Sequence, residues 1–122
     1  MLFAGAKVAF GMQPTPTAKA ATATLTIAEL LTGIVTTSGT VAISLTLPTG
    51  TLTDAGVTGP ALPVNGCFDW AVINAGTSAG AVTLAAGTAH TIVGSATVAI
   101  ATSAGFRTRK TAANTFVSYR MR

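Results

Sequence analysis

The chain has 122 residues, of which 49% are hydrophobic, 6% aromatic and only 8% charged, against about 25% charged residues in an average soluble domain. This length favours one domain and excludes a second. The net charge of +4 is a weak electrostatic footprint for nucleic acid. The remaining surface of threonine, serine, alanine and glycine suits a protein that works inside an assembly, although a small extracellular β domain would share this composition.

Residues 1–24 are expected to form an extended arm, because glycines and prolines interrupt them and the Ala/Thr run that follows has nothing large to bury. A signal peptide is the rival interpretation, since the start is apolar and Ala21-Thr22-Ala23 mimics a cleavage site. No basic residue precedes the apolar part and Lys7 interrupts it, which weakens this interpretation. We expect the arm to lie on a neighbouring subunit or a partner protein, with four candidate contacts: Leu2, Phe3, Lys7 and Phe10.

Residues 25–122 are expected to form the folded domain. The run Thr26-Ile27-Ala28-Glu29 is a capping box that starts a helix of two turns, which Gly33 can end in the left-handed conformation. Glu29 is therefore interpreted as a cap rather than a catalytic acid. Alternating apolar residues predict a half-buried strand over residues 41–47, and residues 49–56 are expected to make a second helical turn.

The stretch 66–76 contains the only tryptophan and the only cysteine. Side chains alternate along a strand, and here both faces are mostly apolar, which predicts a central strand covered on its two sides. Phe68, Trp70 and Val72 are the predicted core residues, because large aromatics bury the most apolar area. Cys67 cannot form an internal disulfide and is interpreted as a small core residue.

Short runs after this stretch recur at the spacing of all-β domains, and they predict further strands at residues 81–85, 89–93, 97–101, 106–110 and 115–121. Residues 111–114 are expected to form the loop of a closing hairpin. The uncharged segment 75–105 is not a membrane span, because glycines interrupt it and threonines alternate with apolar residues. The predicted fold is all-β: a single antiparallel, jelly-roll-like β-sandwich with one or two short helical turns and an extended N-terminal arm.

Chemistry-bearing patterns are weak. Gly76-Thr77-Ser78-Ala79-Gly80 matches the nucleophile elbow of hydrolases, but a strand follows and no acid occurs after Asp69, so we interpret it as a hairpin. His90, the sole histidine, has no ligand-like spacing to Cys, Asp or Glu and is interpreted as a hydrogen-bonded strand or loop residue. Paired-carboxylate glycoside hydrolysis is disfavoured because one acid is a cap and another lies between aromatics. The sequence predicts no catalytic residue, metal or cofactor.

Positive charge gathers in the last sixteen positions, which hold five of the seven basic residues: Arg107, Arg109, Lys110, Arg120 and Arg122. Two pairs at i, i+2 share a strand face, so the final hairpin is predicted to be a basic ribbon. Nucleic acid is the least favoured partner, although Phe116 and Tyr119 are suitable aromatics. Docking of this edge on an acidic protein surface is favoured over nucleic-acid binding. An ordinary solvated edge, whose charges prevent strand addition, is favoured over both. The candidate partner contacts are Arg107, Arg109, Arg120 and Arg122.

Four stretches in this order resemble one family: Leu25-Thr26-Ile27-Ala28-Glu29-Leu30-Leu31-Thr32-Gly33-Ile34, the strand 41–47 ending in Leu47-Pro48-Thr49, Phe68-Asp69-Trp70-Ala71-Val72-Ile73-Asn74, and Phe106-Arg107-Thr108-Arg109-Lys110. Over about residues 25–122 the chain is similar to the small capsid decoration, or cement, proteins of tailed bacteriophages, β-sandwich modules that also occur in head and tail fibres.

The resemblance implies a non-enzymatic homotrimer on the outer surface of the virion. It would bind between subunits of the major capsid protein and stabilise the head, with residues 1–24 as the tether to the shell. The alternative is a head- or tail-fibre module that binds a host receptor or glycan. For the decoration protein, the resemblance implies no small-molecule substrate, no membrane and no cofactor.

Overall fold

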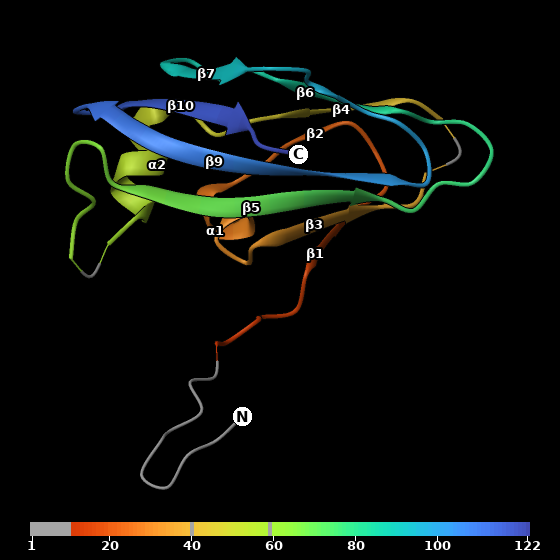
Figure 1. The fold of residues 1–122 in the computed structure, drawn as a ribbon, viewed down its shortest axis with the longest axis horizontal. Coiled ribbons are helices and arrows are strands. Elements are labelled where there is room, and N and C mark those ends of the chain that lie inside the picture. Colours follow the sequence, from red (N-terminus) through yellow and green to blue (C-terminus); the bar gives the residue numbers. More distant parts are fainter. Residues whose placement is uncertain (1–10, 40, 59) are drawn as a thin grey trace, which may run out of the picture.

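The computed structural model describes residues 11–39, 41–58 and 60–122. Two sheets contain all strands of this part of the chain, in the orders β1-β3-β5-β9-β10-β7 and β2-β4-β6-β8. Figure 1 shows the first sheet from β7 at the top to β1 at the bottom, with the second sheet behind it. In chain order the elements are β1 (Thr17–Lys19), β2 (Ala23–Thr24), α1 (Ile27–Leu30), β3 (Ile34–Thr37), β4 (Ile43–Thr46), α2 (Gly50–Gly56), β5 (Cys67–Asn74), β6 (Val82–Ala85), β7 (His90–Val93), β8 (Thr97–Val98), β9 (Thr102–Ala112) and β10 (Thr115–Arg120).

The prediction of a single antiparallel, jelly-roll-like sandwich is wrong, because both sheets are mixed. The pairs β1–β3, β3–β5 and β7–β10 are parallel in the first sheet, as are β2–β4 and β4–β6 in the second. Only β5–β9, β9–β10 and β6–β8 are antiparallel. From β1 to β6 the chain crosses to the other sheet after every strand, so each strand that returns to a sheet runs in the same direction as its predecessor there.

The core lies between the two sheets. Trp70 and Val72 of β5 are buried in it, and Phe68 is half-buried and packs against it. The indole ring of Trp70 stacks on the ring of Phe106 in β9, with 4.7 Å between the centroids. The other buried apolar residues of this cluster are Leu25, Leu30, Val35, Ile43, Leu45, Leu47, Val82, Leu84, Val98 and Ala104.

The expectation that β5 is covered on both sides is wrong. Cys67 is exposed and Ile73 is 39% exposed, although β5 is an interior strand of its sheet. The molecule has only two layers, so the outer face of each sheet meets solvent even where the strand itself is central. Cys67 therefore belongs to the surface, and its assignment to the core is also wrong.

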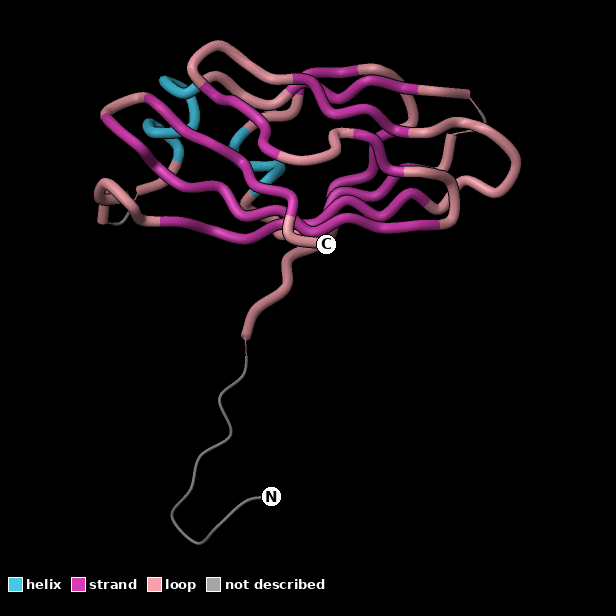
Figure 2. Tube along the Cα trace, turned by 45° about the horizontal axis from the view of Figure 1, so that its top comes forward, coloured by secondary structure: helices cyan, strands magenta, loops and turns pink. Residues whose placement is uncertain are grey.

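The capping box is confirmed. The hydroxyl of Thr26 accepts from the Glu29 amide at 3.2 Å, and Glu29 Oε1 accepts from the Thr26 amide at 2.9 Å. The helix α1 has one turn rather than the two expected, and Gly33 follows it with a φ of +87°. The helical turn at residues 49–56 is confirmed as α2, capped by Thr49. Both helices lie in the same half of the sandwich (Figure 2).

The predicted closing hairpin is confirmed, but β9 is much longer than the expected strand 106–110, and the turn shrinks to residues 113–114. Three strands were not predicted: β1, β2 and β3. Two of them fall within the stretch 1–24 that was expected to be an arm, and they pair with β3 and β4. The segment Gly76–Gly80 is not a hairpin, because it links β5 to β6 and these strands belong to different sheets.

Candidate functional site

The N-terminal candidate contacts Leu2, Phe3, Lys7 and Phe10 lie outside the described residues. The described part of the arm begins with residues 11–16, which are exposed and carry no secondary structure. Figure 1 shows this segment leaving the sandwich at β1, the edge strand of the six-stranded sheet. The described part of the arm therefore leaves the body at this edge.

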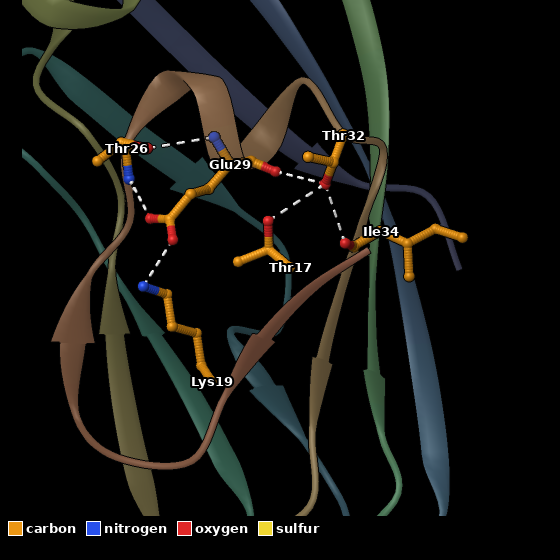
Figure 3. A network of polar contacts seen from close by, with 6 residues as sticks. All are labelled: Thr17, Lys19, Thr26, Glu29, Thr32 and Ile34. Atoms are coloured by element: carbon orange, nitrogen blue, oxygen red, sulfur yellow. Dashed lines mark hydrogen bonds and ion pairs between the residues drawn. The ribbon is translucent and has the colours of Figure 1, made fainter. Parts of the chain in front are cut away.

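A polar network fastens β1 to the body of the molecule (Figure 3). Lys19 Nζ contacts Glu29 Oε2 at 2.6 Å, with about a fifth of each side chain exposed. The hydroxyl of Thr32 donates to the carbonyl oxygen of Glu29 at 2.7 Å and lies 3.5 Å from the hydroxyl of Thr17. Glu29 thus caps α1 and also binds the edge strand β1, because Oε1 accepts from the Thr26 amide while Oε2 contacts Lys19.

Electrostatics supports the same contact. Burial alone would raise the pKa of Glu29, but hydrogen bonds from Lys19 and from Thr26 outweigh it and hold the pKa below its usual value. Further out, Gln13 Nε2 donates to the carbonyl oxygen of Thr32 at 2.6 Å. The described part of the arm is therefore attached to the body at Lys19 in β1 and again at Gln13, in the segment that follows this edge outward.

The predicted basic ribbon is divided between the two faces of the six-stranded sheet. Arg107 and Arg109 share the outer face, as their spacing predicts. Arg107 donates from Nε and Nη2 to the two carboxylate oxygens of Asp69 at 2.7 and 3.0 Å. Arg109 donates to the hydroxyl of Tyr119 and to Asn65, with its guanidinium 5.7 Å from the centre of the tyrosine ring.

The other cations of the hairpin face elsewhere. Lys110 points to the inner side, where its ammonium group donates to Asp54 at 2.9 Å and to the carbonyl oxygen of Leu62. Arg120 donates to the carbonyl oxygen of Thr97 in β8, the edge strand of the second sheet, and to that of Ser95 just before this strand, so it ties the two sheets together. Most of the ribbon's positive charge is thus already engaged within the molecule.

The guanidinium of Arg122 lies on the outer face, directly over Gly105. A Cβ atom placed on Gly105 would stand 2.9 Å from both Nε and Nη2 of Arg122. A hollow of about 330 Å³ opens here, and its wall includes Gln13, Asp69, Gly105, Arg107, Met121 and Arg122. Arg107 and then Arg122 lower the pKa of Asp69, although partial burial opposes them.

His90 is confirmed as a hydrogen-bonded strand residue, and it is fully buried. Its Nδ1 lies 2.9 Å from the carbonyl oxygen of Pro48, which can only accept, so Nδ1 carries the proton. Nε2 then accepts from the hydroxyl of Ser118 at 2.7 Å. Ser118 in turn accepts from Thr108 at 2.7 Å, and Thr108 accepts from the indole of Trp70 at 2.8 Å. Burial lowers the pKa of His90, partly offset by its bond to Pro48.

No arrangement of these residues resembles a catalytic centre. The carboxylates Glu29, Asp54 and Asp69 each pair with a different cation. His90 lies in the core with hydroxyl and carbonyl partners. In residues 11–39, 41–58 and 60–122 no three His, Cys, Asp or Glu side chains are grouped as a metal site would need. Over the same ranges, no helix has the length and apolarity to cross a bilayer.

The outer faces of the two sheets differ in composition. The six-stranded sheet presents Arg107, Arg109 and Tyr119 together with the exposed apolar side chains of Ile73 and Val93. The four-stranded sheet presents small hydroxyl side chains instead: Thr24, Ser44, Thr46, Thr83 and Thr97. Arginine, tyrosine and large apolar residues are enriched in protein interfaces, so the six-stranded sheet has the better candidate face.

Comparison with known proteins identifies no relative: no protein-family model matches the chain, and no curated protein or solved structure matches it significantly.

Two features of the candidate site were not predicted from the sequence. The Lys19–Glu29 contact joins residues from an edge strand and a helix, and only the capping box gave a signal for Glu29. The hollow at Gly105 depends on a strand glycine under a terminal arginine, and a glycine inside a strand is the sequence signal that marks such a close approach.

Proposed function

We propose that the protein is a non-enzymatic structural component of a bacteriophage virion, a homotrimeric decoration protein that binds the outer surface of the capsid and stabilises it. The class of protein is suggested by the resemblance of residues 25–122 to the capsid decoration proteins of tailed bacteriophages. The observation that carries it is the fastening of β1 at Lys19 and Glu29, beyond which the exposed residues 11–16 extend from the edge of the sheet, with one further contact from Gln13 to Thr32. A fixed point of departure is what a tether to a neighbouring surface requires.

The body of the molecule supports the same role. Its three carboxylates form ion pairs, and its histidine is buried with a lowered pKa. These side chains stabilise the fold, which supports a structural role over a catalytic one. A glycan-binding fibre module would present aromatic side chains to its ligand. Here Trp70 is only 3% exposed, because its ring stacks on Phe106 and its indole nitrogen donates to Thr108.

The test uses full-length protein and shells assembled from the major capsid protein encoded with it. Wild-type protein should sediment with expanded shells, and native mass spectrometry should give a trimer. A variant with residues 1–10 replaced by a Gly/Ser sequence of equal length should remain folded and trimeric but lose most shell binding. Full binding by this variant would overturn the tether, and a monomer that ignores shells would overturn the proposed function.

A further inference from the structure

We propose that the hollow over Gly105 binds a carboxylate side chain, an Asp or Glu presented by a protein partner. The inference rests on the proposed function in that the partner is a neighbour in the assembly. It names a contact made mainly by the six-stranded sheet and the last residues of the chain, at a hollow whose wall also includes Gln13 of the arm.

The first support is geometric. Gly105 lies inside β9, where glycine weakens a strand because it has no side chain to pack and loses more conformational freedom. The space above it is taken by the Arg122 guanidinium, which a Cβ atom would meet at 2.9 Å. The backbone groups of the two residues also bond, since the Gly105 amide donates to the Arg122 carbonyl at 3.2 Å. The glycine therefore leaves room for the guanidinium, whose Nε–Nη2 edge faces it.

The second support is charge. The hollow contains two guanidinium groups, Arg107 and Arg122, and one carboxylate, Asp69. Arg107 uses Nε and Nη2 on Asp69, whereas the Arg122 side chain makes no ion pair or hydrogen bond within the described residues. The planar fork of a guanidinium matches a carboxylate with two parallel hydrogen bonds. The unmatched donors of Arg122 select an anionic group.

The surroundings favour a carboxylate that a protein surface presents over a free acid. The hollow is open, and the outer face beside it carries Met121, which is 56% exposed, and Ile73. An acidic side chain of a partner would fill the hollow while the partner's surface covers these apolar residues, an arrangement common in protein interfaces.

The experiment is an NMR titration of the isotopically labelled full-length protein with the peptide acetyl-Gly-Glu-Gly-amide. The Gln peptide of the same sequence is the control ligand, and glucuronate is the test for an acidic sugar. R122Q removes the charge, G105A keeps every charge but pushes the guanidinium out of the hollow, and R109Q removes one charge from the same sheet face outside the hollow.

The Glu peptide should shift the amide signals of residues around Gly105, and the Gln peptide should not. R122Q and G105A should each weaken binding about tenfold or more, whereas R109Q should change it less than about threefold. Equal losses in R109Q and R122Q, or unchanged binding in G105A, would overturn the site. Tighter binding of glucuronate than of the Glu peptide would overturn the assignment to a protein partner.

This assay needs no shell, so its failure is separable from failure of the proposed function. If the wild-type protein binds shells but not the Glu peptide, only the proposed carboxylate site is overturned. If it binds the peptide but not shells, the carboxylate site stands and the proposed decoration role is overturned.

Discussion

The indole Nε1 of Trp70 donates a 2.8 Å hydrogen bond to the hydroxyl of Thr108, on the strand next to it in the sheet. This bond opens a buried chain that passes through Ser118 and His90 to the carbonyl oxygen of Pro48. Each donor in the chain points the same way, because indole can only donate and a carbonyl can only accept. The core of this protein is therefore held by a directed polar chain as well as by apolar contact.

Trp70→Ala should destabilise the fold by about 3–5 kcal/mol, since it removes a buried ring stacked on Phe106 and leaves a cavity. Trp70→Phe should cost less, because it keeps an aromatic ring but leaves Thr108 without its indole donor. Urea unfolding at constant pH measures both changes. An unchanged midpoint for Trp70→Ala would show that Trp70 is not a core residue.

His90 should make stability depend on pH. Burial holds its pKa in the folded protein below the ordinary value of 6.5, so the unfolded chain binds the proton more readily. The stabilisation is complete above pH 6.5 and is lost as the pH falls from there through the folded pKa. Chemical denaturation between pH 8 and 5 should therefore show a declining free energy of unfolding below about pH 6.5.

His90→Gln is the control for this dependence, because its amide does not titrate. Its stability should be nearly constant over the same pH range, whatever its absolute value. The carboxylates Glu29, Asp54 and Asp69 contribute little over this range, since their ordinary pKa values of 4.5 and 3.8 lie below pH 5 and their pKa values in the folded protein are lower still. A wild-type protein with the same flat profile as the variant would contradict the prediction.

Gly50→Ala should destabilise the protein by about 1–3 kcal/mol or more through overpacking. Gly50 is the first residue of α2 and packs against the turns at residues 88–89 and 113–114. An added Cβ would come within 2.7 Å of the carbonyl oxygen of Ala89 and closer still to that of Asn114. Both obstacles are backbone, which cannot rotate away. Gly11→Ala has open space around it and should leave the thermal midpoint unchanged.

Glu29→Gln should loosen β1 without unfolding the domain. The amide oxygen of glutamine can still cap α1 by accepting from Thr26, but the ion pair with Lys19 is lost. Hydrogen exchange at the amides of Thr17–Lys19 should accelerate roughly twofold to fivefold, as expected for a partly exposed ion pair.

Thr26→Ala is the matched variant, since it removes the side-chain cap and leaves the ion pair. Its exchange should accelerate in α1 more than in β1. Equal exchange of β1 in wild-type protein and Glu29→Gln would mean that the ion pair does not anchor the arm.

Local signals in the sequence predicted the capping box, α2, the strand around Trp70 and the closing hairpin. Each of these depends on residues within a few positions of one another: a threonine three residues before a glutamate, or alternating side chains. The bounds of β9 were too short because Ser103 and Gly105 lack the bulk that marks a strand, yet their backbones pair with β5.

Strand direction and sheet membership could not be predicted in the same way. Alternation says which side of a strand is buried, and it is the same for parallel and antiparallel neighbours. The strands β1 and β2 were missed because they are very short and consist mainly of threonine and alanine, whereas β3 was missed as a run of only four residues, although all of them are β-branched. Pairing between distant segments makes all three of them strands. The hollow depends on Arg122 reaching Gly105, a contact between two segments that no local pattern reveals.

The most direct test of the decoration role is the copy number of this chain in purified virus particles, measured by quantitative mass spectrometry against the major capsid protein. A structural protein that covers the shell should be present at a copy number comparable to that of the major capsid protein. A count far below it would contradict decoration of the whole shell and would place the protein at a vertex or in a fibre.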